Sequence, residues 1–382
     1  MKLKTTYLFQ ILLFIYLFSD PRTLFDILFG GGNLSIISLF LTYFFTLIIF
    51  TVSLRKKWNK NSIIFVCILL FMLIIDVVKG RPFIDILMVY MPFAFLISLF
   101  EFYGNRILEI IYTPTLVAIF INILLFVLQN TLLEDRYNSF TQYGSMSGMD
   151  NRFIATYMSP AYLVLFSVYA LYFSQSINNN LLLKGLAIIL SVSLGLMTGS
   201  RGFLIALFIG LIYLLNVGLK KQFKTIAIGT AIYFIFIFQF EHILNQYIMR
   251  LDTSYLMIDI NTRYDGGAGF INLLYAMALG FPESLLYGVT YYTGGVMKFD
   301  YQGVEYSISN SIAHLVGNYG LWGLLYLFFF ISLFFKNMRH KTQYHSENIF
   351  MLFSFFILIM FDSLIYNALF VFAFFRYLYV KK

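Results

Sequence analysis

The stretch at residues 241–309 reads EHILNQYIMRLDTSYLMIDINTRYDGGAGFINLLYAMALGFPESLLYGVTYYTGGVMKFDYQGVEYSIS, and it is the only long interruption in an otherwise almost continuously apolar chain. Its charged residues stand among many Gly and Tyr residues, and they include Arg250, Asp252, Asp259, Arg263, Asp265, Lys298, Asp300 and Glu305. A membrane protein that gathers its polar residues in one loop is expected to carry out its chemistry where that loop meets the bilayer.

The composition excludes an ordinary soluble domain. Hydrophobic residues make up 60% of the chain, charged residues make up 12%, and the mean hydropathy is +0.81. Apolar runs close to the ~20 residues that a spanning helix needs recur along the whole length. We therefore predict an all-α polytopic membrane protein with about twelve transmembrane helices and one large extracytoplasmic loop, in a single transmembrane domain over residues 1–382. The candidate spans are residues 5–19, 34–54, 62–78, 83–101, 108–129, 153–174, 182–198, 203–219, 224–240, 310–335, 347–361 and 364–380.

The distribution of basic residues predicts the orientation of these spans, because cytoplasmic loops carry an excess of Lys and Arg. With the N-terminus in the cytoplasm, seventeen of the 26 basic residues fall inside and nine fall outside. The clusters at residues 55–60, 220–224 and 336–341 all fall inside. We therefore expect both termini in the cytoplasm, and we expect residues 241–309 and a smaller loop at residues 130–152 outside.

The large external loop is expected to contain a helix of its own. The apolar run at residues 270–279 is too short to span a bilayer, and Gly280 and Pro282 end it. We interpret this run as an interfacial or re-entrant helix.

Several classes of function lack their motifs in this sequence. It has no GxxxxGKS or GxxxxGKT phosphate loop, no HExxH motif and no CxxC pair. The four histidines, His242, His314, His340 and His345, do not form a cluster with metal-ligand spacing. ATP hydrolysis and metal-dependent hydrolysis are therefore unsupported, and we expect no cofactor. The net charge of +8 does not indicate a nucleic-acid partner, because the basic residues sit at helix ends.

Arginines on the external side are the unusual feature, because Arg at bilayer depth is costly unless it is paired or solvated. Arg201 lies in the short turn TGSRG, residues 198–202, where its planar guanidinium suits phosphate oxygens. A turn residue that only reaches lipid phosphates is an equal alternative. Arg152 precedes the predicted span 153–174, in which Pro160 can open a polar notch. On this motif alone, an ordinary kink beside an interfacial arginine is favoured.

Two further groups of candidate residues lie in and after the large loop. Arg263, Tyr264 and Asp265 belong to an external turn that is rich in Gly and polar residues. An Arg–Asp surface pair of little energetic weight is the alternative there.

The start of the predicted span 310–335 carries the last group. Ser309 and Asn310 stand at this start, and Ser and Asn are ordinary helix N-caps. His314 lies about one turn further along, on the face that it shares with Asn310. It is either a base or donor that faces a substrate, or a buried histidine that bonds to a neighbouring helix.

Together these elements resemble the integral-membrane polysaccharide polymerases and O-antigen ligases (Wzy and WaaL type). Arg152 with Ser159-Pro160 resembles an Arg…Asn-Pro element of this family. Residues 198–202 resemble its Ser-Arg-Gly turn. Arg263, followed by Asn310-Ser311 ten residues before Gly320, resembles its His-Asn-Ser…Gly element. The resemblance covers about residues 150–340. Ser159 replaces the Asn of the first element, and Ser309 stands where ligases usually carry His, which favours a repeat-unit polymerase.

The resemblance implies a GT-C-like glycosyltransferase of the bacterial cytoplasmic membrane. The donor would be an oligosaccharide on undecaprenyl diphosphate, the acceptor would be a hydroxyl of a second lipid-linked repeat unit, and no metal would be needed. Because the leaving group is a diphosphate, the main task is to stabilise its negative charge. The implied roles are diphosphate binding by Arg152, Arg201 and Arg263, activation of the acceptor by Asp265, His314 or Glu305, and substrate binding by Ser309, Asn310 and Tyr264. A flippase and a chain-length regulator of the same pathway are implied as further partners.

Three alternatives stay open, and the external arginines disfavour one of them, a sensor or scaffold without chemistry. An O-antigen-type ligase would pass the glycan to a different acceptor, and the sequence separates it from a polymerase only at Ser309. A polysaccharide flippase or transporter is the second alternative. Transporters of the major-facilitator type show two similar six-helix halves, whereas the longest loop here follows the ninth predicted span.

Overall fold

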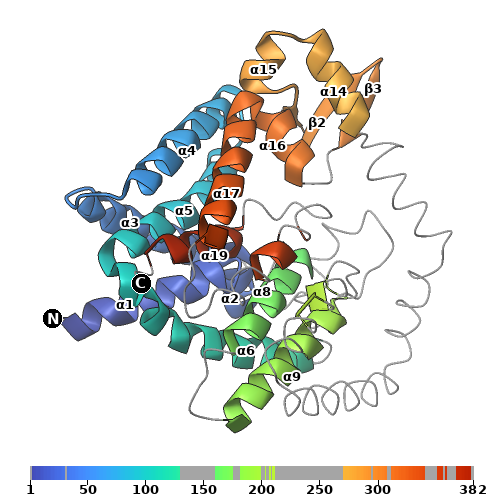
Figure 1. Ribbon diagram of the computed structural model, residues 1–382. Helices are drawn as coiled ribbons and strands as arrows, with labels where there is room; N and C mark the ends of the chain where they lie inside the picture. Colours follow the sequence, from blue (N-terminus) through green and yellow to red (C-terminus); the bar gives the residue numbers. More distant parts are fainter. Residues whose placement is uncertain are drawn as a thin grey trace.

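The computed structural model describes residues 2–30, 32–129, 160–174, 181–198, 203, 206–207, 209–210, 270–293, 296–307, 311–339, 351–355, 358 and 367–379. These residues are mostly helical, as predicted for an all-α membrane protein (Figure 1). The first half of the chain contains α1 (Lys2–Leu17), α2 (Pro21–Phe29), α3 (Asn33–Ser53), α4 (Lys60–Val78), α5 (Phe83–Tyr103), a 3-10 turn at Gly104–Arg106 and α6 (Ile107–Gln129). They are followed by α8 (Pro160–Phe173), α9 (Leu181–Met197), α14 (Phe270–Leu279), α15 (Glu283–Tyr287), the strands β1 (Tyr291–Thr293), β2 (Val296–Tyr301) and β3 (Val304–Ser307), and by α16 (Ser311–Tyr319), α17 (Leu321–Arg339) and α19 (Ala368–Tyr379).

Three helices in the described part of the chain are long and apolar enough to cross a membrane, namely α3, α4 and α5. They coincide to within a few residues with the predicted spans at 34–54, 62–78 and 83–101. Large apolar side chains, such as Phe44 on α3 and Ile74 on α4, are exposed on the outer faces of these helices. Such surfaces are typical of contact with lipid, since water would disfavour them. The total of twelve spans remains a prediction.

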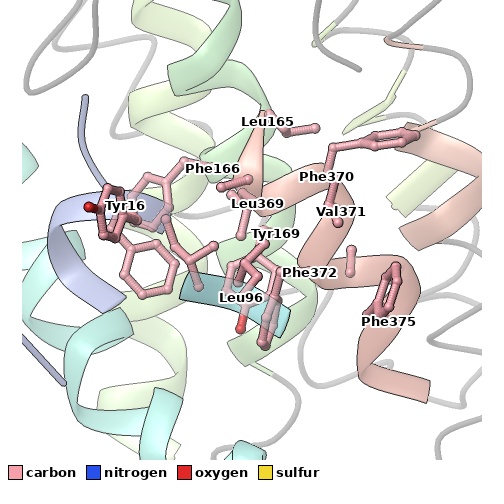
Figure 2. Packing of buried hydrophobic residues seen from close by; sticks show 14 of the residues in the cluster. Tyr16, Leu96, Leu165, Phe166, Tyr169, Leu369, Phe370, Val371, Phe372 and Phe375 are labelled. Atoms are coloured by element: carbon pink, nitrogen blue, oxygen red, sulfur yellow. The ribbon is translucent and has the colours of Figure 1, made fainter. Parts of the chain in front are cut away.

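Two helices form the centre of the bundle. All side chains of α8 from Leu163 to Phe173 are buried, and so are those of α19 from Ala368 to Phe375. Figure 2 shows these helices packed against Tyr16 of α1 and Leu96 of α5. A helix that is apolar on all sides is expected in the interior of a bundle.

The helices define two ends of the molecule. At the first end, the α3–α4 turn contacts the last turn of α5, where the Asn59 amide donates to the Glu101 carboxylate over 3.1 Å. This turn carries Arg55, Lys56, Lys57 and Lys60, and we call this side the basic end. The opposite end contains the turn between α4 and α5. α17 runs antiparallel to α4, because Trp322 stacks on Phe71 near the opposite end and Phe329 stacks on Phe65 nearer the basic end.

A small unit sits at the end opposite the basic end (Figure 1). We call α14, α15, the three strands and α16 the capping unit. The strands form an antiparallel sheet in the order β1-β2-β3, with Tyr291 opposite Lys298 and Asp300 opposite Glu305. Leu273 of α14, Phe299 of β2 and Ala313 of α16 make a core that is separate from that of the bundle. The capping unit therefore has packing of its own.

The capping unit agrees with the sequence in one element and departs from it in two. α14 coincides with the run at residues 270–279 that was predicted to form a separate helix. The small sheet was not predicted. The predicted span 310–335 is wrong as a single helix, because α16 and α17 are separated at Gly320. Gly320 has a left-handed φ of +54°, and a Cβ atom there would collide with the carbonyl oxygen of Leu285 in α15. The break lets α16 pack into the capping unit.

Candidate functional site

The turn between α4 and α5 folds its side chains back onto the end of α4. Gly80 takes a left-handed φ of +71°. The Gly80 amide donates to the Val77 carbonyl over 3.0 Å, and the Arg81 amide donates to the Asp76 carbonyl over 3.0 Å. This pair of bonds is the Schellman pattern that ends helices at a glycine. It brings the side chain of Arg81 within reach of Asp76.

Asp76 is a carboxylate buried at the end of a predicted spanning helix, with an exposed fraction of 0%. Its Oδ2 accepts hydrogen bonds from Tyr90 Oη at 2.9 Å, from Tyr319 Oη at 3.0 Å and from Arg81 Nη1 at 3.2 Å, and the last contact is also an ion pair. An isolated charge at this depth would cost several kcal/mol, so these donors are required to hold it there. Within the described residues, the second oxygen Oδ1 has no hydrogen-bond partner.

Lys79 joins the end of α4 to the capping unit. Its Nζ donates to the Asn318 carbonyl oxygen over 2.6 Å and to Thr290 Oγ1 over 3.2 Å. Burial lowers the pKa of Lys79 from its ordinary value of 10.5 to about 8, and the charge of Asp76 partly offsets that shift. The amine is therefore mostly protonated at neutral pH.

A further bond joins α5 to the sheet, because Tyr292 Oη donates to Asp85 Oδ2 over 2.6 Å. Together these residues form one polar patch between the helix ends and the capping unit. We call it the Asp76 cluster, and its members are Asp76, Lys79, Arg81, Asp85 and Tyr90 from the α4–α5 side and Thr290, Tyr292, Asn318 and Tyr319 from the capping unit. The cluster fixes the capping unit to the long apolar helices α4 and α5.

His314 is attached to the Asp76 cluster. It lies on α16, one turn before Asn318, and its Nδ1 is 3.1 Å from Asn318 Nδ2. The hydroxyl of Thr290 donates to Asn318 Oδ1 over 2.8 Å. Three residues were predicted to activate an acceptor, and the structure describes His314 and Glu305 of them. His314 is connected to this buried network.

Glu305 lies elsewhere, on the exposed surface of β3. It accepts hydrogen bonds from Lys298 Nζ at 2.8 Å and from Tyr291 Oη at 3.1 Å. The bond from Lys298 and the bond from Tyr291 lower the pKa of Glu305 below its ordinary value. Glu305 is thus held in its ionised form by these neighbours, which makes it a weak base.

The other predicted site residues lie outside the part of the chain that the structure describes. These residues are Arg152, Arg201, Arg263, Tyr264, Asp265, Ser309 and Asn310. Their proximity to one another and to His314 therefore remains a prediction.

Asp76 was not among the predicted site residues, although the sequence carries a signal for it. Asp76 is the single charged residue in the apolar run at 62–78. An ionisable residue inside a spanning helix indicates a functional site and requires a partner. The partner Arg81 is five residues away, but Tyr319 is 243 residues away, and no local pattern connects it to Asp76.

In the described ranges, no group of three or more His, Cys, Asp or Glu residues could hold a metal ion. No family model, curated protein or solved structure matches this chain.

Proposed function

We propose that this chain is a polymerase of oligosaccharide repeat units carried on undecaprenyl diphosphate, acting at the outer face of the bacterial cytoplasmic membrane. The bond between C1 of the donor's reducing-end sugar and the phosphate oxygen breaks, and the lipid diphosphate departs. The whole donor glycan is joined through this C1 to a hydroxyl oxygen of a second lipid-linked repeat unit, and the hydroxyl proton passes to a general base. The product would be capsule, exopolysaccharide or O-antigen.

The observation that carries the proposal is the position of the Asp76 cluster, where the apolar helices meet a polar unit. A lipid-linked oligosaccharide has an apolar tail, an anionic diphosphate and a polar glycan, so its site must join the same three environments. Lys79 and Arg81 place two cations at this boundary, beside the carboxylates of Asp76 and Asp85. Ammonium and guanidinium groups favour phosphate oxygens. These two residues would add to the diphosphate candidates Arg152, Arg201 and Arg263.

The proposed orientation has the basic end in the cytoplasm and the capping unit outside, which agrees with the bias of Lys and Arg toward cytoplasmic loops. The outer edge of α14 and α15 then reaches the surface of the bilayer. Leu279 and Phe281 on this edge are 80% and 68% exposed, while the charged residues Lys298, Asp300 and Glu305 lie on the sheet. An apolar edge beside a charged face is typical of a unit that rests at the headgroup boundary.

The test is a reconstitution of the purified full chain in liposomes with an undecaprenyl-diphosphate-linked repeat unit. We expect a ladder of longer lipid-linked glycans on a gel, without added metal or nucleotide. The matched control is the Arg201→Ala variant, which would lose charge-assisted contacts to the diphosphate while the chain still inserts. A wild-type chain that forms no ladder with the repeat unit of its own organism would refute the proposal.

The alternatives give different products in the same experiment and in cells. A ligase would leave the repeat unit unextended and would transfer finished polymer to a separate acceptor. A flippase or transporter would move the labelled glycan across the liposome without forming a new glycosidic bond. Loss of a polymerase in cells leaves single repeat units on the carrier or surface, whereas loss of a ligase leaves intact polymer undelivered.

A further inference from the structure

Lys79 is linked to His314 by hydrogen bonds through Thr290 and Asn318. An ammonium group has donors and no acceptor, so Lys79 Nζ donates to Thr290 Oγ1 over 3.2 Å. The single proton of the Thr290 hydroxyl is then available for the next bond, which spans 2.8 Å to the side chain of Asn318. The Asn318 atom that receives it is the amide oxygen Oδ1.

This assignment decides which atom of Asn318 faces the histidine. With its oxygen on Thr290, Asn318 turns its NH2 group toward His314 Nδ1 at 3.1 Å. The NH2 group is a donor only, so the ring nitrogen opposite it has to be a bare acceptor. Thr290 and Asn318 are buried, with exposed fractions of 4% and 2%, so partners inside the protein set their orientation.

We infer that Lys79, Thr290 and Asn318 hold His314 as a neutral imidazole whose proton is on Nε2, so that the ring acts as a hydrogen-bond donor. The three residues are positioning residues, because they act through the tautomer of the histidine. Protonation of Nδ1 would point two N–H donors at each other, which disfavours the imidazolium form.

The role of this donor in catalysis rests on the proposed function. The nitrogen that a general base would use is already occupied by Asn318, so His314 does not fit the removal of a proton from the acceptor hydroxyl. A neutral Nε2–H fits a phosphate oxygen of the departing lipid diphosphate, where negative charge develops during the reaction. No proton has to leave the ring for this stabilisation.

Nuclear magnetic resonance of the full chain in nanodiscs, with 15N-labelled histidine, tests the tautomer directly. The chain has four histidines, and the His314→Gln variant identifies the signals of residue 314 by their loss. At pH 7 we expect a protonated Nε2 and a bare Nδ1. A proton on Nδ1, in the neutral ring or in an imidazolium, would overturn the inference whatever reaction the protein performs.

Variants of the positioning residues provide a second measurement on the same signals. Asn318→Asp replaces the donor with a carboxylate, which only accepts, so a proton should appear on Nδ1. Thr290→Val removes the hydroxyl that orients the amide and should mix the two tautomers, whereas Thr290→Ser keeps the hydroxyl and should preserve the wild-type spectrum. The matched control Asn272→Asp, at a half-buried position of α14 outside this chain of bonds, should also leave it unchanged. An unaltered His314 spectrum in both Asn318→Asp and Thr290→Val would contradict the positioning role of these residues.

Activity in the liposome assay separates a donor from a base. His314→Ala should lower the turnover rate by about 10²–10³-fold, the effect of removing one donor to a developing anion. His314→Gln carries an amide N–H near the position of Nε2 and should recover much of that loss, with little change in KM. Equal losses in both variants would overturn the donor role. A wild-type chain without polymerase activity would overturn the proposed function, and the spectrum would still decide the tautomer.

Discussion

Removal of the Asp76 carboxylate is the most informative perturbation of the structure. Asp76→Ala deletes three hydrogen bonds to one oxygen and leaves Arg81, Tyr90 and Tyr319 without this acceptor. Breaking a buried ion pair by removing one partner costs about 3–5 kcal/mol. The side chain of Arg81 is 19% exposed and can reach water. We therefore expect the free energy of unfolding to fall by about 3 kcal/mol, near the lower limit of this range. Asp76→Asn keeps an acceptor for the tyrosines and should lose only about 1–3 kcal/mol.

The assay is unfolding of the purified full chain in mixed micelles with increasing dodecyl sulfate, followed by circular dichroism. A double-mutant cycle with Tyr319→Phe tests whether the cost comes from the cluster. Tyr319→Phe should cost about 1 kcal/mol more in the wild-type chain, where it removes a bond to Asp76, than in the Asp76→Ala chain, where that bond is already gone. Equal costs in the two backgrounds, or an Asp76→Ala chain as stable as wild type, would refute the reasoning.

Three further predictions concern other parts of the structure. In a lysine 13C titration, Lys79 should lose its proton near pH 8, and a midpoint near that of exposed lysines would contradict this. Its contribution to the free energy of unfolding should rise from pH 8 to about 10.5, because in this pH range Lys79 is protonated in the unfolded chain and not in the folded chain. Gly320→Ala should destabilise the chain by about 1–2 kcal/mol or more in the same unfolding assay, because of the left-handed φ of Gly320 and its contact with Leu285. Unchanged stability would be inconsistent with the break between α16 and α17 at Gly320. A spin label at position 281 in nanodiscs should be accessible to oxygen, and a label at position 302 should be accessible to an aqueous nickel chelate. Equal access of the chelate at both positions would exclude contact of Phe281 with lipid.

Local sequence determines where the long apolar helices form and where some of them end. The runs that form α3, α4 and α5 are long, apolar and nearly free of charge, so each can satisfy its backbone bonds only as a helix in lipid. The helix at Phe270–Leu279 also follows from local sequence, since Gly280 and Pro282 end a run that is too short to cross a bilayer.

Tertiary structure decided the site and the break before α17. Residues 310–335 are apolar enough to read as one span, and Gly320 inside them is tolerated in many helices. Its left-handed turn brings the backbone against Leu285 of α15, a contact between two segments that the sequence of residues 310–335 does not reveal.

The Asp76 cluster likewise depends on contacts between distant segments, with Lys79 bonded to Asn318 across 239 positions of the chain. Local patterns report which residues are apolar or charged. Only the folded chain shows which donor meets which acceptor, because a hydrogen bond requires two groups within about 3 Å and in line.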